Sequence, residues 1–182
     1  MRTRIRRHRA HRLMRGGGFS LMELVVVMTV TVIMSGVAVV AMSSTTGNRA
    51  AIAAKRLLRD MTFARQRAIA TGTGTWVVFD TGAETWSILS EDPSSPGRAG
   101  ATALTDPATG GDMVETLGTG SFIGVELVSA TFDAGSEVGF DWLGQPLNSA
   151  DTTLAAAGTV TLSDGHQITV TISTGHIAYV AP

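Results

Sequence analysis

One acidic residue stands at the head of the most apolar part of this sequence. Glu23 is the only charged residue between Arg15 and Arg49. A carboxylate in a membrane helix is unfavourable by about 2.5–3.5 kcal/mol at the bilayer centre, and by less near its edge. A buried charge of this kind needs a partner of opposite charge, so Glu23 indicates ion-pairing chemistry. The spacing Ser20-x-x-Glu23 also fits a capping box, in which both side chains bind backbone N–H groups of the first turn. Helix physics alone leaves both interpretations open.

Patterns typical of catalytic or metal sites are weak in the rest of the chain. The absence of cysteine removes disulfides, metal–thiolate sites and thiol nucleophiles. His166 and His176 lie in or beside predicted turns, where exposed surface histidines are the common case. Asp92, Asp106 and Asp112 are too widely spaced for a compact calcium loop. No serine lies in a nucleophile-elbow pattern. The sequence therefore predicts no enzyme activity, no cofactor and no metal site.

Basic and acidic residues are segregated along the chain. Seven of the 14 basic residues are arginines within the first 15 positions, and all 15 acidic residues lie at Glu23 or later. Without residues 1–18 the chain has 7 basic against 15 acidic residues and a formal net charge of −8. Because phosphate binding needs an excess of Lys and Arg, this acidic body argues against nucleic acid as a partner.

Residues 24–48 form the element that would position Glu23. These 25 uncharged residues would extend roughly 37 Å as a helix, at about 1.5 Å per residue, which is enough to cross a bilayer. The β-branched residues in this run would also suit a strand. Its uninterrupted length favours a membrane helix, in which the backbone polar groups are satisfied internally. By the positive-inside rule, the arginine-rich end stays cytoplasmic and the chain after residue 48 lies outside.

Three interpretations of this segment remain open from the residues alone. The first is a plain membrane anchor with a basic cytoplasmic stub. The second is a secretory signal peptide, for which Val39-Val40-Ala41 offers small residues before a cut at Met42. The third is a signal that is cut before the apolar stretch, so that the stretch is retained.

The motif Gly18-Phe19-Ser20-Leu21-Met22-Glu23, followed by the apolar segment, closely resembles the signal of type IV pilins and type II secretion pseudopilins. The resemblance implies that a membrane prepilin peptidase cuts after Gly18 and methylates Phe19, the new N-terminus. It also implies that Glu23, the fifth mature residue, takes part in filament assembly. Residues 1–18 would be the cleaved basic leader. That leader is long for the family, and a start at Met14 would give the same mature chain.

A second helix and a β-rich region follow. We expect an amphipathic helix over residues 49–74 that ends at Gly72 and Gly74, with basic residues on its solvated face. Its apolar stripe comprises Ile52, Leu57, Leu58, Met61, Ala64, Ala68 and Ile69. Residues 75–182 alternate as short strands with turn signals, which predicts an antiparallel β domain and an α+β fold overall. The predicted strands are 75–80, 85–89, 122–128, 137–142, 158–162, 167–172 and 176–180, and residues 90–120 are a predicted long loop.

The segments FARQRAIA at residues 63–70 and VGFDWLGQP at residues 138–146 resemble minor pseudopilins of the GspH/FimT type. The resemblance implies a long N-terminal helix, residues 19–48 transmembrane and residues 49–74 amphipathic, packed on an antiparallel β-sandwich. It implies a single-pass protein of the bacterial inner membrane whose periplasmic domain joins a type II secretion pseudopilus. Expected partners are the prepilin peptidase, the inner membrane, other pilin-like subunits and exported protein cargo.

Two rival functions remain. One is a minor pilin of a type IV pilus, acting in DNA uptake. His176 stands where the DNA-binding relatives prefer arginine, and no Lys or Arg follows Arg98, which disfavours DNA capture. The other rival is an exported or anchored β domain that ordinary signal peptidase processes.

Overall fold

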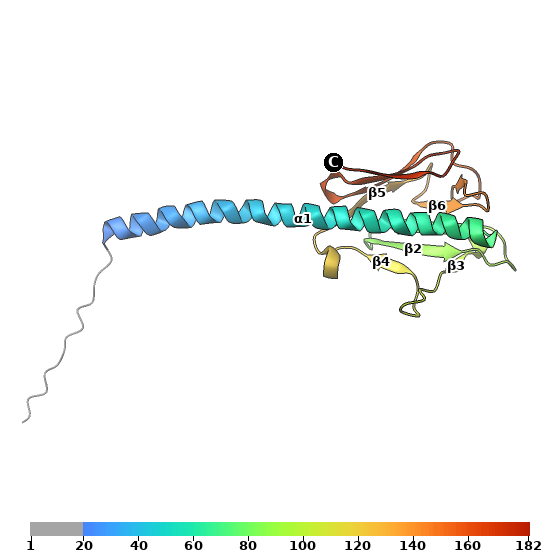
Figure 1. Cartoon of the computed structure of the whole chain (residues 1–182), viewed down its shortest axis with the longest axis horizontal. Helices are drawn as coiled ribbons and strands as arrows, with labels where there is room; N and C mark the ends of the chain where they lie inside the picture. The colour runs from blue at the N-terminus through green and yellow to red at the C-terminus, as the bar shows by residue number, and fades with distance from the viewer. Residues whose placement is uncertain (1–19) are drawn as a thin grey trace, which may run out of the picture. The chain divides into compact units, whose positions relative to one another are not determined.

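The computed structural model describes the backbone of residues 20–182 and the side chains of residues 20–35 and 47–182. The chain divides into two compact units, Met1–Ala41 and Met42–Pro182. The cleavage residues Gly18 and Phe19 lie outside the described residues (Figure 1).

The helix α1 spans Leu21–Thr71. It begins with a bond of 3.1 Å from the Leu24 N–H to the Ser20 carbonyl. In the first unit its hydroxyl side chains bind the helix's own backbone: Thr29 donates to the Val25 carbonyl at 2.6 Å and Thr31 to the Val27 carbonyl at 2.7 Å. The described part of this unit therefore presents a mainly apolar surface.

The predicted membrane segment falls only partly within these residues. Residues 36–46 of the segment lie outside the side chains that the structure describes. Within the described residues, no helix meets the length and apolarity needed to cross a membrane.

In the second unit α1 packs one face on the β domain. The residues on that face with no exposed surface are Ala50, Ala53, Ala54, Leu57, Met61, Ala64 and Ala68. Most of them are alanines, which let the helix backbone approach the sheets closely. The predicted stripe was wrong at Ile52 and Ile69, which remain 53% and 46% exposed, because the small residues rather than the large ones define the buried face.

The helix α1 ends where the sequence predicts. Gly72 adopts a left-handed φ of 70° and donates its N–H to the Ala68 carbonyl at 2.9 Å, so the helix ends as expected at a glycine. The backbone is helical throughout Leu21–Thr71, so the helix continues through the polar residues 43–48, which are weak helix formers. Helix propensity is a weak determinant that the rest of the structure commonly overrides.

The first sheet is antiparallel, with strand order β3-β2-β1-β6-β7 and β4 also paired with β2. Its strands are β1 Thr75–Asp80, β2 Thr85–Ser90, β3 Thr102–Ala103, β4 Val114–Thr116, β6 Glu137–Phe140 and β7 Pro146–Leu147. The predicted loop 90–120 thus contains two short strands, both of which pair with β2. It also contains the 3₁₀ turn η1, Arg98–Gly100.

The second sheet has the order β10-β9-β8-β5 and is also antiparallel. Its strands are β5 Leu127–Thr131, β8 Gly158–Leu162, β9 Gln167–Val170 and β10 Ile177–Val180. The predicted strand 122–128 was wrong. Gly120 and Gly124 take positive φ angles and residues 120–122 form the 3₁₀ turn η2, so extended structure begins only at Leu127.

Alternate residues of both sheets point into one core, which they share with α1. Phe79 of β1 stacks on Phe132, just after β5, with ring centroids 5.7 Å apart. The second sheet contributes Val160 and Ile168 to the same core. The α+β fold, a helix packed on antiparallel sheets, is therefore confirmed (Figure 1).

Candidate functional site

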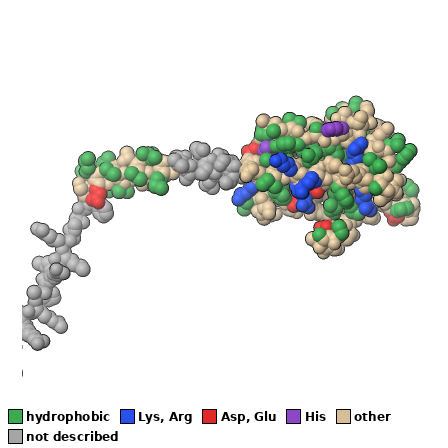
Figure 2. All heavy atoms as spheres, viewed as in Figure 1, with side chains coloured by type: hydrophobic (Ala, Val, Ile, Leu, Met, Phe, Trp, Pro, Cys, Tyr) green, Lys and Arg blue, Asp and Glu red, His purple; other side chains and the backbone are tan. Residues whose placement is uncertain are grey.

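Glu23 lies in the first turn of α1 and is exposed. Val26 and Val27, three and four positions later, lie on the same side of the helix and are about half-exposed. The ion pairs that the structure describes all lie in the second unit, and Glu23 has none with a described residue. Figure 2 shows acidic atoms at the start of the helix and mainly hydrophobic atoms along the following turns. The geometry thus presents a carboxylate at the head of an apolar helical surface.

Basic side chains of α1 fasten the helix to the β domain. Arg65 donates from Nε to the Gly144 carbonyl and from Nη2 to the Thr174 carbonyl, both at 3.0 Å. Arg49 donates to the Ile123 carbonyl at 3.3 Å. The prediction of a solvated basic face was therefore wrong for Arg65, which is half-buried and bound to the β domain. Sequence reasoning missed these roles because the acceptors lie 74 to 109 positions away in the chain.

A polar cluster lies between α1 and β2, with Asp60 and Trp86 buried and Arg56 partly exposed. Asp60 accepts from Trp86 Nε1 at 3.0 Å and from Arg56 Nε at 3.3 Å. Arg56 in turn reaches Glu115 of β4 at 3.3 Å. These bonds satisfy the carboxylate of Asp60 and the indole nitrogen of Trp86, so the cluster positions the helix on the sheet.

The two histidines differ in environment. His166 is buried, and its Nδ1 lies 2.7 Å from the hydroxyl of Tyr179 on β10. His176 is exposed. The interpretation of both as exposed turn residues was therefore wrong for His166, because β10 folds back over the turn that carries it.

The acidic residues of the loops accept hydrogen bonds from neighbouring residues of the same loop. Asp92 accepts from the side chain and backbone N–H of Ser94, and these bonds hold the pKa of Asp92 below its usual value. Asp106 accepts from the backbone N–H of Ala108 at 2.8 Å and from the Thr109 hydroxyl at 3.1 Å. Within the described residues, no group of three or more His, Asp or Glu side chains is placed to hold a metal ion.

Comparison with known proteins gives a family match and several structural matches. Residues 53–175 match the family described as type II transport protein GspH. One structure of the minor pseudopilin EpsH from the type 2 secretion system of Vibrio cholerae has a TM-score of 0.52 at 15% identity, covering 74% of this chain and 98% of that chain. A second EpsH structure has a TM-score of 0.55 at 13% identity, covering 74% and 97%.

The type IV minor pilin FimU of Pseudomonas aeruginosa matches with a TM-score of 0.45 at 14% identity, covering 73% of this chain and 89% of that chain. No curated protein matches the sequence significantly. At these identities the EpsH structures establish a shared fold.

Proposed function

Because the chain belongs to the family of type II transport protein GspH, we propose that it is a minor pseudopilin of a type II secretion system. In this role it is a structural subunit of a periplasmic filament that moves exported proteins across the outer membrane. The observation that carries the proposal is the family match over residues 53–175 on a chain whose helix α1 carries Glu23 in its first turn. The role is mechanical and assigns no catalysis to the chain.

The proposal includes processing by a prepilin peptidase. The peptidase cuts between Gly18 and Phe19, and methylates the amine of Phe19. The motif around these residues supports the cut, and the acidic fifth residue of the mature chain, Glu23, supports the use of the new N-terminus in assembly.

Assembly then follows from charge pairing. Glu23 is an exposed carboxylate on an apolar helix surface, and burying it among other helices without a cation would be strongly unfavourable. The N-terminal amine of a neighbouring subunit supplies that cation. A subunit inserted at the wrong height leaves both charges unpaired, so the pair sets the register of each subunit.

Before assembly the subunit resides in the inner membrane. The uncharged segment 24–48 and the arginine-rich leader support a single pass, with the β domain in the periplasm. The same design serves a type IV pilus, which is the alternative filament. A role in DNA uptake is disfavoured by the lack of Lys and Arg after Arg98.

Replacement of Glu23 tests the assembly step in the native host. Glu23→Ala is expected to be cleaved after Gly18 yet to be lost from isolated filaments, whereas Glu23→Asp, which keeps the charge, retains a measurable fraction. The measurements are the N-terminal sequence of the membrane protein and its amount in filaments isolated from the cell envelope. Incorporation of Glu23→Ala at the wild-type level would contradict the pairing role.

A further inference from the structure

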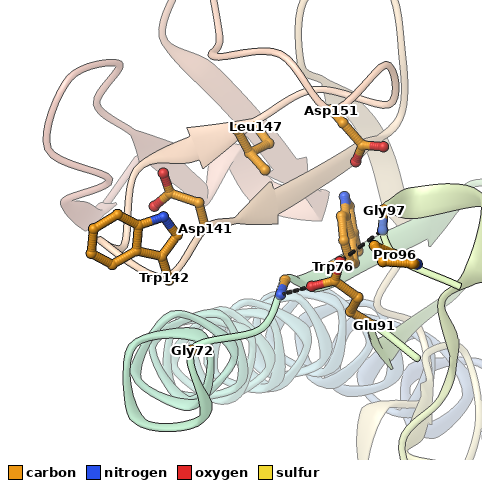
Figure 3. Close-up of a pocket in the computed structure, with 10 residues that line it drawn as sticks. Gly72, Trp76, Glu91, Pro96, Gly97, Asp141, Trp142, Leu147 and Asp151 are labelled. Atoms are coloured by element: carbon orange, nitrogen blue, oxygen red, sulfur yellow. Dashed lines mark hydrogen bonds between the residues drawn. The ribbon is translucent and has the colours of Figure 1, made fainter. Parts of the chain in front are cut away.

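A pocket of about 360 Å³ opens beside the C-terminal end of α1. We name it the Trp76 pocket. Its floor is Trp76 of β1, and its walls come from the segment after β2, with Glu91 and Gly97, and from residues 141–151 around β7 (Figure 3). Trp76 lies on the face of the first sheet that points away from the shared core, since its neighbours Thr75 and Val77 take the other face.

The pocket is acidic. Glu91 accepts from the Gly74 N–H at 2.5 Å and from the Gly97 N–H at 2.7 Å. Asp141 accepts from the Leu143 N–H at 2.9 Å, and Asp151 from the Arg98 N–H at 2.9 Å. These bonds fix the three carboxylates in place, and their negative charges have no cationic side chain beside them among the ten lining residues, all of which are described.

The surroundings add further negative potential. The C-terminal end of α1 carries the negative pole of the helix dipole, and its last turn contains no basic residue. The side chain of Arg98, next to Gly97 in sequence, is turned to Glu137, which it binds at 2.7 Å. The pocket therefore favours a cation.

Trp76 supplies a second and independent feature. The residue is 1% exposed, and its indole Nε1 has no hydrogen-bond partner among the described residues. Figure 3 shows the indole inside the pocket with its nitrogen toward Asp151. The ring lies flat on Gly139 of β6, where an added Cβ would overlap the nitrogen. An unsatisfied buried donor is unfavourable, so an acceptor group brought into the pocket would be bound there.

Trp142 completes the arrangement at the rim. It is 62% exposed although it is a large aromatic residue, and it lines the pocket beside Asp141. The face of an indole attracts cations, and a guanidinium group stacks on it especially well.

We propose that the Trp76 pocket binds an arginine or lysine side chain of a partner protein. The cationic group lies between the carboxylates and the face of Trp142, and a backbone carbonyl of the same partner segment accepts from Trp76 Nε1. The acidic lining repels the phosphates of nucleic acid and lipid, and the carboxylates are not grouped for a metal ion within the described residues. The inference rests on residues 72–151 alone, so it stands or falls separately from the filament role.

The three tryptophans of the chain make the test direct, because each gives one indole N–H signal in a nitrogen–proton correlation spectrum. The full ¹⁵N-labelled chain in detergent micelles is titrated with N-acetyl-arginine methylamide and, separately, with the neutral N-acetyl-glutamine methylamide. We expect saturable shifts of the Trp76 and Trp142 signals with the arginine compound only. Trp86, whose N–H already binds Asp60, is the internal control and stays unmoved.

A matched pair of variants tests the geometry. Trp142→Ala is expected to weaken binding of the arginine compound about 2- to 5-fold. Leu143→Ala, the adjacent and similarly exposed residue outside the lining, leaves the affinity unchanged. The proposal is overturned by the absence of saturable shifts, by equal shifts with the glutamine compound, or by equal effects of the two variants.

Discussion

The carboxylate of Asp60 on α1 accepts a hydrogen bond of 3.0 Å from the indole nitrogen of Trp86 on β2, inside the core. Asp60 is 8% exposed and Trp86 1% exposed. The helix and the sheet thus meet through a polar bond beside the apolar core. This bond fixes how far along the sheet the helix lies, since a shift of one helical turn would leave the Trp86 N–H buried without its partner.

Removal of the carboxylate is expected to destabilise the protein. Asp60→Ala leaves the Trp86 N–H buried and unsatisfied, which lowers the free energy of unfolding by about 1–3 kcal/mol. Urea unfolding followed by tryptophan fluorescence measures it. Arg59→Ala, the exposed neighbour on the same helix, serves as control and is expected to change the value by less than about 0.5 kcal/mol. Equal losses in the two variants would show that the bond contributes nothing specific.

Arg65 is expected to resist conservative replacement. Its guanidinium donates to the carbonyls of Gly144 and Thr174 at once, and a lysine ammonium lacks the planar fork needed to reach both. Arg65→Lys should lower the free energy of unfolding by about 1.5–3 kcal/mol, with exposed Gln66→Ala as the control on the same turn. An unchanged midpoint of urea unfolding would mean that the turns containing Gly144 and Thr174 hold their positions without Arg65.

Gly158, at the start of β8, is expected to tolerate no side chain. A Cβ there would overlap the ring of Phe132, which is itself stacked on Phe79. Gly158→Ala should therefore cost about 1–3 kcal/mol of stability through overpacking. Gly111→Ala, where an added Cβ meets only open space and one atom at 3.9 Å, is the matched control. The same urea titration measures both, and a neutral Gly158→Ala would contradict the packing seen around Phe132.

Asp133 gives a pH dependence with a definite sign. The Asn148 amide donates to its carboxylate at 3.1 Å, as does the Ala155 N–H, and these bonds hold its pKa below the usual 3.8. Because the folded-state pKa is depressed, the stabilisation is complete above pH 3.8 and is lost as the pH falls through the folded-state value. Asp133→Asn, which tolerates the positive φ of 52° at this position, is the comparison. The stability gap between the two proteins should shrink below pH 3.8; a gap that stays constant with pH would refute this origin.

The local elements were predictable where short-range signals dominate. Gly72 ends α1 and Asp164-Gly165 marks the turn before β9, because glycine and short polar residues tolerate the required backbone angles. The strand over residues 122–128 was misplaced because these residues are mostly apolar and suited to a strand, while Gly120 and Gly124 take positive φ angles that bend the chain. Composition alone does not show which glycines adopt positive φ.

The contacts that join the helix, the strands and the turns to one another were not predictable from the sequence. The acceptors of Arg65 lie 79 and 109 positions along the chain, and the burial of His166 depends on Tyr179 of β10. The Trp76 pocket likewise gathers residues from 72 to 151. A single sequence shows patterns at the spacing of helices and strands, but it does not show which residues far apart in the chain come into contact.

The N-terminus and intact mass of the protein purified from host membranes test the prepilin route. We expect a chain that begins at Phe19 and carries about one added methyl group, which would establish that route and support filament assembly. A chain that begins at Met42 would indicate an ordinary exported domain, and an uncut chain would indicate a plain membrane anchor. Either of these two results would contradict the pseudopilin role.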